Sequence, residues 1–201
     1  MKIAVFVSGR GSNLQAILNS SEEKKNIEVS AVFSDKVDCP AFDIARRYAI
    51  PTFSLGNSEG SIGYQDLSGV LSKLNIEFIV LAGFLKLMPD EVVLNFDKKI
   101  INIHPALLPS FGGKGMYGLN VHRAVFLSSA KISGVTVHFV DITYDTGKII
   151  VQRCVDISDV RSPEEIAERV LKLEHQILPY VVGKFADNKV RIVDGRIVIL
   201  E

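Results

Sequence analysis

Apolar residues in the first half of the chain form short continuous runs, and segments with a helical period separate them. The runs lie at 2–8, 27–34, 51–55, 78–83 and 99–104. The helical segments lie between them, at 12–20, 39–49 and 63–75. Strands that are apolar on both faces and alternate with helices are typical of a parallel sheet covered on both sides. The pattern therefore predicts an α/β fold with a doubly wound, mostly parallel sheet.

The second half predicts antiparallel structure. Long strands at 134–140 and 148–157 are joined only by the loop DITYDTG. A loop that short forces an antiparallel hairpin, because a parallel return needs a crossover. A smaller hairpin is predicted at 190–200, over the turn Asp194-Gly195. The fold is thus expected to have an antiparallel C-terminal part.

A long helix is predicted between these two hairpins, at 162–188. Ser162 can cap it, Pro163 suits its first position, and Glu165 completes a capping box. Pro179 should kink this helix, since a proline in a helix interior removes a backbone hydrogen bond.

Length and charge narrow the class of protein. The 201 residues carry 23 basic and 23 acidic side chains, so the formal net charge is zero. This length fits a single domain over residues 1–201, and the charge balance offers no footprint for nucleic acid or an anionic membrane. The charged run at 22–25 is interpreted as a solvated face.

Cysteines and apolar runs bear on the compartment. Cys39 and Cys154 lack metal-ligand spacing and are interpreted as two reduced, buried thiols. The first residues are wrongly flanked for a signal peptide, and no run of about 18 apolar residues is available to span a membrane. A soluble, cytoplasmic protein is expected.

A glycine-rich turn, SGRGSN at 8–13, joins the first predicted strand to the first helix. Its glycines allow backbone amides to converge on an anion, and the helix N-terminus adds its positive dipole end. Leu14 replaces the third glycine of a dinucleotide fingerprint, and the Gly-Lys-Ser/Thr of a Walker loop is missing. The turn either holds a phosphate or is a plain strand-to-helix connection.

Polar residues also end a later strand. Asn102 and His104 share one face of the strand 99–104, because alternate side chains of a strand point the same way. Ligands of α/β sheets bind beyond the carboxyl ends of the strands, where the glycine-rich turn and the segment 83–88 are also expected. Asn102 and His104 are either a catalytic pair or a strand-to-loop exit.

Two carboxylates are further candidates. Asp145 lies in the hairpin loop, where it can approach a histidine, and Glu174 borders the apolar face of its helix, either solvated or partnered at a cleft. The glycine-rich stretch 112–118 is a lid or a surface excursion. No metal site is expected, since metal-ligand spacing is absent from the other histidines, His122, His138 and His175.

Five motifs together resemble the phosphoribosylglycinamide formyltransferases, folate-dependent enzymes of purine synthesis. The motifs are SGRGSNLQAI, VLAGFLKLM, INIHPALLPSF, GVTVHFVDITYDTGKII and LEHQILP. In this order they extend over nearly the whole chain. The resemblance implies a Rossmann-like formyltransferase fold, with no metal. It also implies transfer of the formyl group of 10-formyltetrahydrofolate to the amine of N1-(5-phosphoribosyl)glycinamide.

The resemblance assigns roles to individual residues. The family's catalytic trio matches Asn102, His104 and Asp145. Its phosphate-binding loop matches Gly11, Ser12 and Asn13, and a residue near the substrate ribose matches Glu174. Its pterin pocket matches Leu85, Lys86, Leu87, Met88 and Asn102. The family often presents an arginine to the folate near the helix 63–75, and none is present there; the loop 112–122 is longer than the common form and is assigned no role.

The implied reaction is a direct transfer. The substrate amine attacks the formyl carbon, and Asn102 and His104 stabilise the oxyanion that forms. Asp145 raises the pKa of His104, which relays the proton to the leaving nitrogen. The expected partners are small-molecule substrates, and the protein is expected to be a monomer or homodimer.

Three other functions remain open at this point. A methionyl-tRNA formyltransferase would be expected to carry a further tRNA-binding domain and a basic surface, which the zero net charge disfavours. A sugar-amine formyltransferase would share the catalytic trio, but the phosphate-type turn disfavours it. A non-catalytic nucleotide-binding module would have no need of Asn102, His104 and Asp145 together.

Overall fold

The protein is described by a computed structural model that covers residues 1–23 and 26–201. These residues form two compact units, Met1–Asn102 and Ile103–Glu201. The solvated face predicted at 22–25 lies outside the described side chains. A single domain over 1–201 stays a prediction.

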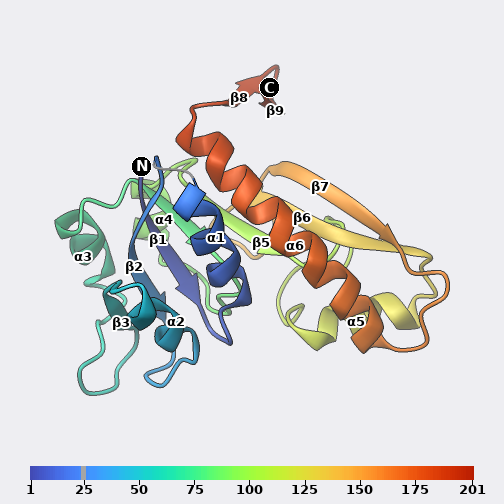
Figure 1. Cartoon of the computed structure of the whole chain (residues 1–201), viewed down its shortest axis with the longest axis horizontal. Helices are drawn as coiled ribbons and strands as arrows, with labels where there is room; N and C mark the ends of the chain where they lie inside the picture. The colour runs from blue at the N-terminus through green and yellow to red at the C-terminus, as the bar shows by residue number, and fades with distance from the viewer. Residues whose placement is uncertain (24–25) are drawn as a thin grey trace. The chain divides into compact units, whose positions relative to one another are not determined.

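The first unit is built on a parallel sheet, as predicted from the apolar runs. Its strands follow the order β3-β2-β1-β4-β5, and every neighbouring pair is parallel (Figure 1). The strands are β1 (Lys2–Val7), β2 (Glu28–Ser34), β3 (Thr52–Ser54), β4 (Phe78–Leu81) and β5 (Ile100–His104). The last two residues of β5 begin the second unit.

Helices cover both faces of this sheet because the chain reverses direction across it. From β1 the chain winds outward to β3 and then returns to β4 on the other side of β1. Right-handed crossovers therefore place the first two helices on one face and the next two on the other. α1 (Ser12–Glu23) packs on α2 (Ala41–Arg47), and α3 (Leu67–Lys73) packs on α4 (Asp90–Asn95). The doubly wound α/β fold is confirmed.

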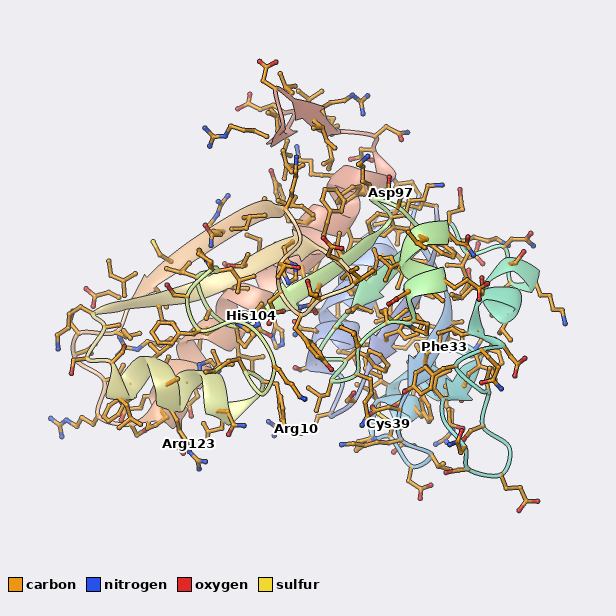
Figure 2. All side chains as sticks on the ribbon, turned by 180° about the vertical axis from the view of Figure 1, so that it is seen from behind. Arg10, Phe33, Cys39, Asp97, His104 and Arg123 are labelled. Atoms are coloured by element: carbon orange, nitrogen blue, oxygen red, sulfur yellow. The ribbon has the colours of Figure 1, made fainter. Side chains whose placement is uncertain are left out.

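Aromatic side chains tie the outer strands of the first unit to its centre. The ring of Phe6 stacks on that of Phe33 with centroids 4.8 Å apart, and Phe33 stacks on Phe53 at 5.1 Å. Phe33 is fully buried, and Figure 2 labels it. Such pairs contribute roughly 0.5–1.5 kcal/mol each beyond their burial, so they help to hold the short edge strand β3 in place.

The second unit contains the predicted antiparallel hairpin. β6 (Ile132–Phe139) pairs antiparallel with β7 (Ile149–Asp156), and α6 (Pro163–Ala186) packs on both. A helix that the sequence did not predict, α5 (Leu119–Leu127), packs on α6. The start of α5 is difficult to predict because the helix follows a glycine-rich stretch and its N-cap residue is Gly118, which has a φ of 54°.

The ends of α6 agree with the sequence in most respects. The Ser162 hydroxyl accepts the backbone N–H of Glu165 at 3.3 Å, as a cap should. The reciprocal bond differs, because the Glu165 carboxylate accepts the N–H of Arg161 rather than that of Ser162. The helix continues through Pro179 to its end at Ala186.

The small hairpin at the C-terminus is also confirmed. β8 (Val190–Val193) pairs antiparallel with β9 (Arg196–Ile199) beyond the end of α6 (Figure 1). The turn residues Asp194 and Gly195 have φ values of 49° and 76°, as a two-residue hairpin turn requires.

The two cysteines differ in their burial. Cys39 is buried as predicted, whereas the prediction for Cys154 is wrong. Cys154 is exposed because it lies on β7, most of whose side chains are half-buried or exposed. Among the helices described, none has the length and apolar character needed to cross a membrane.

Candidate active site

The glycine-rich turn leaves β1 at the point where the strand order reverses. The backbone N–H of Ser8 donates to the carbonyl of Gly83 at 3.0 Å, and the Ser8 hydroxyl accepts the N–H of Leu85 at 3.0 Å. These two bonds join the carboxyl ends of β1 and β4. In an open α/β sheet, this reversal is the position where a ligand-binding crevice forms.

The turn itself is held rigidly by its glycines. Gly11 has a φ of +78°, and a Cβ there would lie 2.6 Å from the Cβ of Ala41. The thiol of Cys39 donates to the carbonyl of Gly9 at 3.4 Å (both Arg10, between the glycines, and Cys39 are labelled in Figure 2). Only glycine meets both requirements at position 11, because L side chains are strained at this φ and α2 leaves no room.

The other predicted ligand residues of the first unit lie at the same edge of its sheet. Ser12 begins α1 and is exposed, whereas Asn13 is buried. The segment after β4 presents Leu85 and Leu87 with over a third of their surface exposed, while Met88 is buried. The turn 11–13 and the segment 85–88 therefore both follow strands at the carboxyl edge, as predicted.

β5 carries the predicted Asn-x-His pair. Asn102 is half-buried and lies opposite Leu81 of β4, and His104 is only 3% exposed. The intervening Ile103 is buried on the other face of the strand. β5 therefore delivers an amide and an imidazole on one face.

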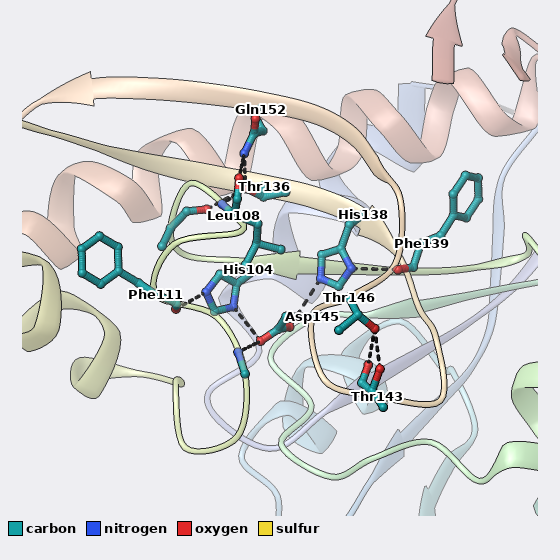
Figure 3. A network of polar contacts seen from close by, with 12 residues as sticks. His104, Leu108, Phe111, Thr136, His138, Phe139, Thr143, Asp145, Thr146 and Gln152 are labelled. Atoms are coloured by element: carbon teal, nitrogen blue, oxygen red, sulfur yellow. Dashed lines mark hydrogen bonds and ion pairs between the residues drawn. The ribbon is translucent and has the colours of Figure 1, made fainter. Parts of the chain in front are cut away.

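His104 is held by two acceptors, one at each ring nitrogen (Figure 3). Its Nε2 atom lies 2.8 Å from the backbone carbonyl of Phe111. Its Nδ1 atom lies 3.6 Å from Oδ2 of Asp145. A carbonyl oxygen can only accept, so Nε2 carries the hydrogen in the neutral ring and Nδ1 is the atom that titrates.

Asp145 lies between two imidazoles rather than beside one. Its Oδ2 faces His104 and accepts the backbone N–H of Gly113 at 2.8 Å. Its Oδ1 lies 3.5 Å from Nε2 of His138. Asp145 has a φ of 57°, so the backbone of the hairpin loop adopts a left-handed conformation at this residue.

Burial and charge oppose one another at this cluster. Burial lowers the pKa of His104, and the charge of Asp145 and the Phe111 carbonyl only partly offset it. Asp145 therefore acts on this pKa in the expected direction, by raising it, but the nearly complete burial of the ring has the larger effect and the net shift is downward. Burial would raise the pKa of Asp145, but His138, the N–H of Gly113 and the charge of His104 outweigh it and lower the pKa.

Two contributors to this cluster were missed from the sequence. The sequence shows no metal-ligand spacing around His138, and the structure instead places its ring against Asp145. The available signal was a histidine inside an apolar, β-branched strand, where a buried polar side chain requires a partner. The loop 112–122 was assigned no role, although the N–H of Gly113 binds Asp145.

Glu174 lies in the second unit, on α6. Its exposed fraction is only 9%, so the solvated alternative is excluded. It is buried on α6 together with Val170 and Ile177. A buried carboxylate is stable only with a partner, so Glu174 belongs to the partnered alternative.

Metal ligands were not expected, and the described residues hold no group of three or more histidine, cysteine or acidic side chains that could bind a metal ion.

Comparison with known proteins defines the class. A model of the formyl transferase family matches residues 1–182, and the chain belongs to this family. It is 45% identical over 195 residues to the chloroplastic phosphoribosylglycinamide formyltransferase of Arabidopsis thaliana, covering 94% of this chain and 67% of that protein. It is 35% identical to the phosphoribosylglycinamide formyltransferase of Bacillus subtilis, covering 90% of this chain and 92% of that protein.

Solved structures agree with these relatives. The phosphoribosylglycinamide formyltransferase of Anaplasma phagocytophilum is 34% identical and has a TM-score of 0.89, covering 100% of this chain and 93% of that chain. The glycinamide ribonucleotide transformylase 1 of Symbiobacterium toebii is 32% identical with the same TM-score, covering 100% and 94%. Within the formyl transferase family, the chain therefore belongs with the phosphoribosylglycinamide formyltransferases.

The plant relatives are longer than this chain and are chloroplastic by name. The chain spans 67%, 62% and 64% of the proteins from Arabidopsis thaliana, Vigna unguiculata and Glycine max. The cytoplasmic location expected from the sequence stays a prediction.

Proposed function

We propose that this chain transfers the formyl group of 10-formyltetrahydrofolate to the amine of N1-(5-phosphoribosyl)glycinamide, a step of de novo purine synthesis. One observation carries the proposal. In a member of this family, the buried His104 at the end of β5 presents its titrating nitrogen to the ionised Asp145. Both partners are small molecules, and the protein acts as a monomer or homodimer.

The substrate phosphate binds at Gly11, Ser12 and Asn13. The N-terminus of α1 presents backbone N–H groups and a positive dipole end, both of which favour an anion. The rigid turn supports this role, since Gly11 is fixed against Ala41. Glu174 accepts hydroxyl groups of the substrate ribose, a role suited to a carboxylate that is buried on α6.

The folate donor binds along Leu85, Lys86, Leu87 and Met88, with Asn102 at the reacting end. Leu85 and Leu87 expose apolar surface that the flat pterin ring can cover. Backbone groups of this segment supply the polar contacts of the ring. No residue of the chain is assigned to the folate tail.

The reaction begins when the substrate amine attacks the formyl carbon and negative charge develops on the formyl oxygen. The Asn102 side chain donates an N–H to this oxygen. A well-placed donor of this kind contributes ~3–4 kcal/mol to transition-state stabilisation. His104 supplies a second stabilising charge once it has accepted the proton of the attacking amine and become an imidazolium.

His104 moves the proton at its Nδ1 atom. Burial keeps its pKa low, so the resting ring is neutral and can accept a proton from the attacking amine. Asp145 then stabilises the imidazolium, at a separation of 3.6 Å from Nδ1. Return of this proton to the folate nitrogen releases tetrahydrofolate and restores the neutral ring.

A formyl-transfer assay tests the proposal. Wild-type protein, His104→Ala and Asp145→Asn are compared with N1-(5-phosphoribosyl)glycinamide and 10-formyltetrahydrofolate as substrates. The wild type is expected to turn over and both variants to lose most of their activity. His175→Ala is the matched control, since His175 lies on α6 and the imidazoles that lie against Asp145 are those of His104 and His138.

Two outcomes would contradict the proposal. If the folded wild type shows no turnover, the substrate assignment is wrong, and amino-sugar nucleotides are the next acceptors to assay. If the wild type turns over but His104→Ala does so equally well, the assigned mechanism is wrong.

A further inference from the structure

The segment from Pro105 to Phe111 forms a loop that is closed by a hydrogen bond between His104 and Phe111. It begins immediately after His104, and its last carbonyl accepts the Nε2–H of the same His104 at 2.8 Å. The position of this carbonyl therefore depends on the path of the segment. Phe111 has a φ of +57°, a conformation that a bulky side chain adopts only when its surroundings impose it.

Two side chains of the β6–β7 hairpin hold the middle of this segment (Figure 3). The fully buried hydroxyl of Thr136 donates to the carbonyl of Ala106 at 2.7 Å and accepts the N–H of Leu108 at 3.0 Å. The amide of Gln152 donates to the carbonyl of Leu108 at 2.9 Å. It also lies 3.0 Å from the Thr136 hydroxyl. We call Thr136 and Gln152 the loop clamp.

The loop clamp provides hydrogen-bond partners for the backbone N–H and carbonyl of Leu108. Leu108 is buried, so its backbone N–H and carbonyl would lose their hydrogen bonds to water without replacement. Thr136 and Gln152 satisfy both groups from neighbouring strands, which cross-strand pairing places opposite each other.

We propose that Gln152 is a positioning residue for His104: through Thr136 it fixes the loop that holds the Phe111 carbonyl on Nε2, and so determines which ring nitrogen titrates. This inference rests on the proposed role of His104. Without the clamp, the Phe111 carbonyl shifts, and the neutral ring can carry its hydrogen on either nitrogen. The fraction with a free Nδ1 facing Asp145 then falls.

Loss of the clamp should also change the pH dependence of activity, because the Phe111 carbonyl affects the pKa of His104. The groups that face its ring are Asp145 in the hairpin loop, His138 on β6 and His122 on α5. None of these is altered by a substitution at 152. The Phe111 carbonyl favours the protonated ring, so its displacement moves the acid limb of the activity profile to lower pH.

The first test uses Gln152→Leu and Gln152→Glu, because leucine has no polar hydrogen and an ionised glutamate can only accept, so neither donates to the Leu108 carbonyl. We expect kcat to fall about 10- to 100-fold with KM nearly unchanged, as the loss of one hydrogen bond from a catalytic geometry implies. The acid limb of the kcat profile moves to lower pH. If kcat and the profile are unchanged while the protein is only less stable, the inference is overturned.

Substitutions at Thr136 test the other half of the loop clamp, and a substitution at Ser133 on the same strand is the control. Thr136→Val removes the hydroxyl and should reproduce the Gln152 phenotype, whereas Thr136→Ser keeps the hydroxyl and should restore wild-type kcat. Ser133→Ala removes a buried hydroxyl of the same strand, whose oxygen has no hydrogen-bond partner in the part of the chain that the structure describes. It should change neither kcat nor the pH profile, and an equal loss in Ser133→Ala would overturn the inference.

A readout without substrate separates this inference from the proposed function. Nitrogen-15 NMR of the histidine rings reports which nitrogen of His104 is protonated, and it needs no turnover. In the wild type the hydrogen should reside on Nε2, and in Gln152→Glu a mixture of tautomers should appear. An unchanged Nε2 tautomer in a folded Gln152→Glu protein contradicts the clamp, even if the transfer reaction itself is absent.

Discussion

The Nε2 atom of His138 lies 3.5 Å from Oδ1 of Asp145, on the carboxylate oxygen that His104 does not face. The two histidines therefore share one carboxylate, each on its own oxygen (Figure 3). His138 is itself fixed from behind, since its Nδ1 lies 2.8 Å from the carbonyl of Phe139. Because that carbonyl accepts, the hydrogen of a neutral His138 resides on Nδ1, and only a protonated ring donates to Asp145.

Replacing His138 tests whether this second contact orients Asp145. His138→Leu should lower kcat roughly 10-fold, because Oδ1 of Asp145 then loses the ring that lies 3.5 Å from it and the carboxylate is no longer fixed opposite His104. KM for the amine substrate should stay nearly constant, as the phosphate contacts are unaffected. Steady-state kinetics measure both quantities, with His175→Leu as the control, and an unchanged kcat would assign His138 to packing alone.

Replacing Asp145 should move the titration of His104. Asp145→Asn removes the negative charge 3.6 Å from Nδ1, which disfavours the imidazolium. The pKa of His104 is already lowered by burial, so it should fall further below its usual 6.5. Proton NMR of the ring measures this shift directly. A pKa that rises in Asp145→Asn would show that the carboxylate does not stabilise the protonated ring.

The glycine-rich turn offers a matched pair of substitutions. Gly11→Ala introduces a Cβ 2.6 Å from that of Ala41 at a φ of +78°, so the turn must move. At Gly9 the same substitution meets nothing within 4 Å. KM for the phosphorylated substrate should rise at least tenfold in Gly11→Ala and change little in Gly9→Ala. Equal effects of the two substitutions would argue against a phosphate site built on this turn.

The sequence predicted those parts of the fold that a local pattern determines. The apolar runs became strands β1 to β5 because a strand buried on both faces admits few polar residues. The short loop before Lys148 made the β6–β7 hairpin necessary. Helices α4 and α5 escaped prediction because α4 is six residues long and α5 follows a glycine-rich stretch.

The candidate site was predictable only as far as its residues follow strand ends. Asn102 and His104 could be placed because β5 ends there. The contact between Asp145 and His138 joins the hairpin loop to β6. It depends on a register shift in the β6–β7 pairing next to His138, which no sequence pattern predicts. The direction of the pKa of His104 also depended on burial, which a residue pattern cannot quantify.

A buried histidine outside the proposed mechanism should make the fold sensitive to acid. His122 on α5 is 6% exposed, and its Nδ1 has no hydrogen-bond partner among the described residues. Burial, with the nearby His104, lowers the pKa of His122 to about 4. Between pH 4 and 6.5 the unfolded chain therefore binds more protons at this residue than the folded protein does, so the free energy of unfolding rises with pH across this window and levels off above it.

Replacing His122 should reduce the dependence of the free energy of unfolding on pH. The contribution of His122 lost on acidification is on the order of 2–3 kcal/mol, as a pKa shift from 6.5 to about 4 implies. His122→Leu removes the titrating group together with its unpaired nitrogen, so it should unfold at a urea concentration that depends less on pH between 4 and 6.5. Urea titrations at pH 7 and pH 5 measure the difference. His104 also has a lowered pKa, so some pH dependence should persist in the variant. A slope identical to that of the wild type would show that His122 is protonated in the folded protein as readily as in the unfolded chain.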